Sequence, residues 1–127
     1  MNPIYNTTER RSHPRYAVQK GAVAFGETSV NRLGHVEDIG MGGISFRYMY
    51  FEDDSESLDT INLYFPKYKF HLKKLAVRII SDIEEFNPSQ FKTVTMKRCG
   101  MQFSHLTPDQ KEQIERFISL YTTDKTK

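Results

Sequence analysis

The chain has 127 residues, enough for one hydrophobic core and too few for two, so we expect a single domain. Apolar residues make up 38% of it and 18 basic residues nearly balance 16 acidic ones, a composition typical of folded soluble proteins and not of disordered or membrane-embedded chains. The net charge of +2 is too small to indicate nucleic-acid binding by composition alone.

The first half of the chain predicts an arm followed by strands. Residues 1–14 show little apolar periodicity, and we expect them to form a mobile arm. β-Branched and aromatic residues predict a strand over 15–25, with a change of parity near Gly21 that is typical of a bulge. A second strand is predicted over 33–39. Large apolar or aromatic residues recur at every second position over 44–50, with Ser45, Arg47 and Met49 between them, and this period of two predicts a half-buried strand.

The second half predicts three more strands after an acidic loop. The acidic residues of 52–59 are typical of a solvated loop. Alternation then predicts a strand over 61–65, a longer one over 67–83 with a bend near 73–74, and a last one over 91–104.

One helix is predicted, over 108–122. Thr107 can cap it, Pro108 suits the first helical position, and Gln110 completes a capping box. Its apolar stripe consists of Ile114, Phe117, Ile118 and Tyr121. About six short strands followed by one helix favour an antiparallel barrel or sandwich flanked by the helix, with the compact domain over 15–123.

Motifs of catalysis and metal binding are absent from the sequence. The four histidines are far apart, and the single cysteine, Cys99, cannot supply a zinc framework. The glycine cluster GMGG leads into a strand and not a helix, so it is no dinucleotide fingerprint. We expect a protein that is not an enzyme and holds no metal or cofactor. The lone cysteine and the polar N-terminus favour the cytoplasm, and we expect no membrane partner.

Two short motifs carry the functional information. They are RRSHPR over 10–15 and DIGMGG over 38–43. In order and spacing they resemble the PilZ domain family, whose signature is RxxxR in an N-terminal arm followed by (D/N)xSxxG. The matching residues are Arg11 and Arg15 in the first motif and Asp38 and Gly43 in the second. The closing segment GMQFSHLTPDQKEQIERFISLY also looks like the family's last strand and helix, so the resemblance covers nearly the whole chain.

The resemblance implies a fold and a ligand. PilZ domains are all-β with one C-terminal α-helix, built as a six-stranded antiparallel barrel, and serve as bacterial receptors for cyclic di-GMP. A downstream protein partner is implied as well. In the family, a basic residue at the position of Arg10 accompanies an intercalated ligand dimer. The ligand-binding residues implied are Arg10, Arg11, Arg15, Asp38, Gly40 and Gly43.

The residue types suit this ligand. A guanidinium group can hold phosphate oxygens through two hydrogen bonds, pair with the O6 and N7 edge of guanine, or stack on a base. The Asp38 carboxylate can accept from N1 and N2 of guanine together. The glycines would permit positive φ angles and the close approach of a base. Alternatively, the arginines form a solvated basic tail and Asp38 caps a turn.

Gly40 departs from the signature, which usually has serine there. The missing hydroxyl removes one hydrogen bond, worth about 0.5 to 1.5 kcal/mol, so we expect binding weakened by up to about tenfold and not abolished. One alternative is a degenerate protein adaptor of the same fold without nucleotide binding. Another, disfavoured by the modest net charge, is a small barrel that binds single-stranded nucleic acid.

Overall fold

The computed structural model describes residues 13–26, 33–50, 59–85 and 95–125. Every strand pair in this part of the chain is antiparallel. The elements in chain order are β1 (Tyr16–Val18), β2 (Val23–Gly26), β3 (Gly34–Ile39), β4 (Gly43–Tyr50), β5 (Thr60–Phe65), the 3-10 turn η2 (Pro66–Tyr68), β6 (Phe70–Glu84), β7 (Thr95–His105), α1 (Pro108–Tyr121) and β8 (Thr122–Lys125).

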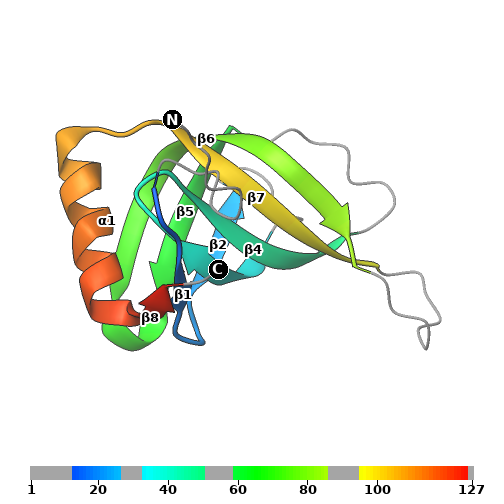
Figure 1. Cartoon of the computed structure of the whole chain (residues 1–127), viewed down its shortest axis with the longest axis horizontal. Coiled ribbons are helices and arrows are strands. Elements are labelled where there is room, and N and C mark those ends of the chain that lie inside the picture. Colours follow the sequence, from blue (N-terminus) through cyan, green and yellow to red (C-terminus); the bar gives the residue numbers. More distant parts are fainter. Residues whose placement is uncertain (1–12, 27–32, 51–58, 86–94, 126–127) are drawn as a thin grey trace, which may run out of the picture.

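Six of these strands close into a barrel. They pair in the order β2, β5, β6, β7, β4 and β3, and the additional pairing of β2 with β3 completes the ring. β1 pairs with the far end of β3, and β8 pairs with β1. Figure 1 shows α1 beside the barrel, so the predicted six-stranded antiparallel barrel with one C-terminal helix is confirmed.

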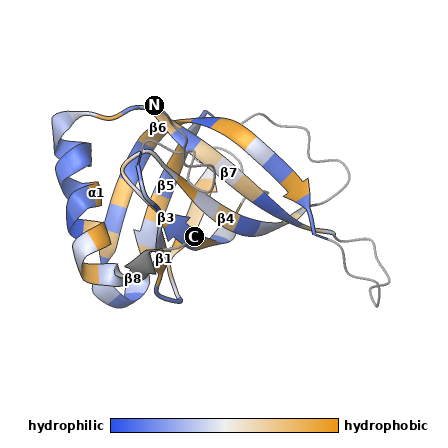
Figure 2. Ribbon diagram, viewed as in Figure 1, coloured by the Kyte–Doolittle hydropathy of each residue, from blue (hydrophilic) through white to orange (hydrophobic). Residues whose placement is uncertain are grey.

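The core fills the barrel and the space beneath α1. Along β4, Ile44, Phe46 and Tyr48 are buried, as the alternation predicted. Phe117 of α1 is buried too, and its ring lies 5.1 Å from that of Phe70 in an edge-on contact. Burial of each such large apolar side chain contributes about 2 kcal/mol. Hydrophilic residues make up most of the rest of α1, where the ribbon is largely blue (Figure 2).

The strand predicted over 15–25 is two strands. Gly21 has φ +113°, and the turn there separates β1 from β2. Both strands still pair with β3, since Tyr16 lies opposite Ile39 and Val23 lies opposite His35. The parity change was read correctly, but a turn at positive φ produces it and not a bulge inside one strand.

The bend predicted in the long strand is confirmed. Lys74 has φ +58°, the pairing of β5 with β6 shifts register between Ile61 and Leu63, and the amide of Lys74 donates to the side-chain oxygen of Asn62. The bend lets one strand serve two parts of the barrel wall.

The C-terminal helix is confirmed, and one strand was missed. The side chains and amides of Thr107 and Gln110 form the reciprocal capping box. α1 ends at Tyr121, and the chain then continues as β8, which sequence analysis did not predict because Thr122–Lys125 carries no apolar alternation. In the part of the chain that the structure describes, no helix has the length and apolar character needed to cross a membrane.

Candidate functional site

A groove of about 920 Å³ lies on the outer wall of the barrel. It crosses β3, β4, β7 and part of β6, and it is bounded by β1 and the turn that follows it. This volume is within the range of small-molecule sites. The acidic and basic side chains that line the groove, apart from His35, are Arg15, Lys20, Glu37, Asp38, Arg47 and Arg98. The four cations and two carboxylates suit an anionic ligand that also offers hydrogen-bond donors.

A bulge in β3 places two consecutive carboxylates in this groove. The register with β4 shifts between Val36 and Asp38, so Glu37 is the extra residue. Val36 and Ile39 are both buried in the core, whereas Glu37 and Asp38 between them line the groove. Strict alternation would have turned one of the two acids inward. In the sequence, the apolar residues Val36 and Ile39 lie three positions apart within one strand. This departure from the two-residue period of a strand is the signal that could have revealed the bulge at Glu37.

The strand pairing brings the two sequence motifs together. β1 runs antiparallel to the end of β3, with Tyr16 opposite Ile39, and this places Arg15 beside Asp38. Nη1 of Arg15 donates to Oδ1 of Asp38 at 2.9 Å, and these side chains are only 7% and 15% exposed. Nη2 of Arg15 lies 2.6 Å from the place a Cβ on Gly43 would occupy. The guanidinium thus spans both ends of the second motif.

The glycines serve close approach and not positive φ, so that part of the prediction is wrong. Gly21 is the glycine with positive φ among the described residues. A Cβ on Gly40 would lie 2.1 Å from the carbonyl oxygen of Pro14, and a Cβ on Gly43 would lie 2.1 Å from that of Met101. Both positions therefore need glycine because a neighbouring backbone, from the arm or from β7, occupies the space.

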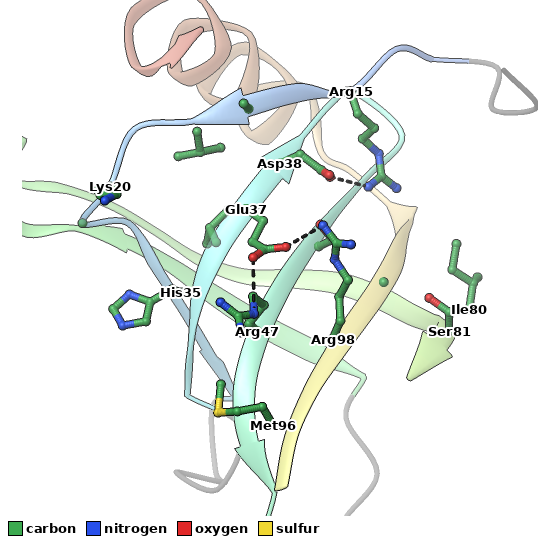
Figure 3. Close-up of a pocket in the computed structure, with 16 residues that line it drawn as sticks. Arg15, Lys20, His35, Glu37, Asp38, Arg47, Ile80, Ser81, Met96 and Arg98 are labelled. Carbon is green, nitrogen blue, oxygen red and sulfur yellow. Dashed lines mark hydrogen bonds and ion pairs between the residues drawn. The ribbon is translucent and has the colours of Figure 1, made fainter. Parts of the chain in front are cut away.

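A second set of ion pairs lies across the groove from Arg15 (Figure 3). Arg47 on β4 lies directly opposite Arg98 on β7, and Glu37 reaches both, at 2.6 Å to Nη2 of Arg98 and 3.5 Å to Nε of Arg47. Arg47 also holds Glu85, at 2.7 Å from its Nη2. The hydrogen bond to Glu85 raises the pKa of the Arg47 guanidinium, with burial opposing it, so this group stays charged.

Two predicted site residues are outside the part of the chain that the structure describes. Arg10 and Arg11 fall outside the described residues, so their place in the site stays a prediction. His35 and Arg47 belong to neither motif, and both line the groove. In the described ranges there is no group of three histidine, cysteine or acidic side chains that could hold a metal ion.

Ser45 is a polar side chain with an unusual environment. It lies opposite Asp38, is 7% exposed, and its hydroxyl has no hydrogen-bond partner among the described residues. A buried hydroxyl without a partner destabilises a fold.

Ser45→Ala is therefore expected to leave the free energy of unfolding unchanged or to raise it by up to about 1 kcal/mol in urea titrations. Ser104→Ala, at an exposed position of β7, is the control, and a clear loss for Ser45→Ala alone would contradict this.

Comparison with known proteins identifies the class that this barrel and groove define. The sequence model of the PilZ domain matches residues 9–120, so the chain belongs to the PilZ domain family. No curated protein sequence matches it significantly. Among solved structures, the PilZ domain with c-di-GMP of YcgR from Escherichia coli superposes with a TM-score of 0.66 at 14% identity, covering 87% of this chain and 90% of that one.

Two longer structures are similar in fold as well. The K. pneumonia MrkH–c-di-GMP complex gives a TM-score of 0.65 at 18% identity, and YcgR from Escherichia coli in complex with c-di-GMP gives 0.60 at 17%. They cover 88% and 87% of this chain. The chain spans only 52% of that MrkH chain and 45% of that YcgR chain, so it corresponds to one part of those proteins.

Proposed function

We propose that the groove binds cyclic di-GMP and that the domain is a non-enzymatic receptor for this nucleotide. The observation that carries the proposal is the contact between Arg15 and Asp38, at 2.9 Å, on the wall of a groove large enough for a nucleotide. One motif supplies the guanidinium and the other the carboxylate, as expected if the two act on one ligand. Family membership supports the same ligand class.

The groove offers complementary groups for each part of the ligand. Cyclic di-GMP has two phosphates and two guanines. Guanidinium groups such as that of Arg15 can hold phosphate oxygens or the O6 and N7 edge of guanine, and Asp38 can accept from N1 and N2. Arg11 and Arg10 precede Arg15 in the chain, so a ligand held at Asp38 would be within reach of the arm.

Signalling would follow from ordering of the arm. Arg10 and Arg11 of the arm carry two positive charges, and the ligand's phosphates would neutralise them and hold the arm against the barrel beside Arg15. The surface that the domain presents to a protein partner then changes with occupancy. In this proposal the receptor acts in the cytoplasm, a location that the single cysteine of the sequence favours.

Titration of the isotope-labelled domain with cyclic di-GMP tests the proposal. Amide shifts are expected at Arg15 and over 38–43, and calorimetry should show binding that falls at least tenfold in Arg11→Ala, because a charge-assisted hydrogen bond is worth about 1.5 to 3 kcal/mol. Arg116→Ala, at an exposed position of α1, is the matched control. Unshifted groove amides at millimolar ligand would overturn the proposal.

One observation supports a second candidate function, that of a protein adaptor that does not bind the nucleotide. At Gly40 the backbone of Pro14 occupies the space that the family's serine would need. If this arrangement prevents binding, the barrel would act on a protein partner without the nucleotide.

The remaining alternative is a barrel that binds single-stranded nucleic acid. Its affinity would fall steeply as the salt concentration rises, which an oligonucleotide titration at two salt concentrations would reveal.

A further inference from the structure

Arg98 is a groove arginine that belongs to neither sequence motif. It projects from β7, its side chain is 52% exposed, and its Nη2 is paired with Oε1 of Glu37 at 2.6 Å. Glu37 precedes Asp38 in the chain, and the bulge turns both carboxylates into the same groove. Since consecutive Cα atoms are about 3.8 Å apart, a side chain that reaches Glu37 is also within reach of a ligand held at Asp38.

Glu37 occupies a position that an anionic ligand could take. Its carboxylate lies between Arg98 and Arg47, which face each other across neighbouring strands and would otherwise repel (Figure 3). Arg47 has a second carboxylate in Glu85, held through Nε and Nη2. Displacing Glu37 would therefore leave Arg47 paired and make the Arg98 guanidinium available to the ligand.

We propose that Arg98 contacts the nucleotide, exchanging Glu37 for a phosphate group when the ligand enters. This inference rests on the proposed function and adds a residue to that site. The exchange is favourable because a phosphate can accept two hydrogen bonds from one guanidinium, whereas the Glu37–Arg98 ion pair, with side chains 28% and 52% exposed, is weakened by solvent and costs little to break. Glu37 then acts as an internal competitor that lowers affinity.

Two substitutions test this exchange by moving affinity in opposite directions. Arg98→Gln is expected to weaken cyclic di-GMP binding about tenfold, the usual effect of losing one charge-assisted hydrogen bond. Glu37→Gln is expected to strengthen binding about threefold while lowering the unfolding midpoint slightly, because Arg47 and Arg98 then face each other without Glu37. In the double variant the gain should vanish, because Glu37 competes only through Arg98.

Matched controls separate this contact from general charge effects. Arg116→Gln and Glu112→Gln change the net charge equally at exposed positions of α1 that do not line the groove. The Nε–Hε resonance of Arg98 should also shift on titration of the wild-type domain.

Failure of the Arg98 inference can be distinguished from failure of the proposed function. If the wild type binds while Arg98→Gln behaves like Arg116→Gln and Glu37→Gln brings no gain, the Arg98 inference is overturned and the proposed function stands. If the wild type does not bind, both are overturned.

Discussion

Replacement of Asp38 by alanine is expected to reduce cyclic di-GMP affinity at least about a hundredfold, because two hydrogen bonds from guanine to a charged acceptor are lost together. It should also lower the free energy of unfolding, since the Arg15 side chain, 7% exposed, loses its carboxylate. Breaking a buried pair costs about 3 to 5 kcal/mol, and about 2 to 4 kcal/mol is expected here because Asp38 keeps some solvent contact and Arg15 has further interactions. Calorimetry and urea unfolding measure the two effects.

Asp38→Asn separates recognition from stability. The amide keeps the shape of the side chain but offers one acceptor and one donor, which suits the N1 and N6 edge of adenine better than the two donors of guanine. The preference for cyclic di-GMP over cyclic di-AMP should therefore narrow in this variant. General destabilisation would lower the affinities for the two nucleotides by the same factor. An unchanged ratio of the two affinities in Asp38→Asn would therefore show that Asp38 only holds Arg15 in place.

Local periodicity predicted most of the barrel. The alternation of Ile44, Phe46 and Tyr48 with polar neighbours identified β4, and the capping residues Thr107 and Pro108 identified the start of α1, because each pattern depends on residues close in sequence. The motifs predicted that Arg15 and Asp38 act at one site, and the structure places their side chains 2.9 Å apart, but the pairing itself was not predicted and their roles toward a ligand remain predictions.

Features that depend on distant neighbours were not predicted. β8 exists because β1 offers it an edge, and nothing within its own four residues indicates a strand. The role of Gly43 depends on the carbonyl of Met101, which lies far away in sequence. Glu37 was overlooked because the bulge that turns it outward is defined by the register with β4.

Placing the family's serine at position 40, as Gly40→Ser, is expected to lower the stability of the domain and not to raise its affinity for the nucleotide. A Cβ there would lie 2.1 Å from the carbonyl oxygen of Pro14 and 3.3 Å from Cδ of Arg15. Since the nearest atom belongs to backbone, the segment must shift, and Arg15 moves away from Asp38 with it. We expect a loss of about 1 to 3 kcal/mol in the free energy of unfolding, typical of overpacking, and no gain in cyclic di-GMP affinity.

Gly40→Ala is the matched control, because it adds the same Cβ without the hydroxyl. Equal stability losses in the two variants would assign the effect to the clash with Pro14, and any difference in affinity between them measures the hydroxyl alone, up to about tenfold. A serine variant that keeps its stability and binds tenfold more tightly would contradict this account. In that case the backbone at Pro14 moves aside at little cost in free energy. The missing hydroxyl, and not the position of Pro14, then limits the affinity of the natural chain for cyclic di-GMP.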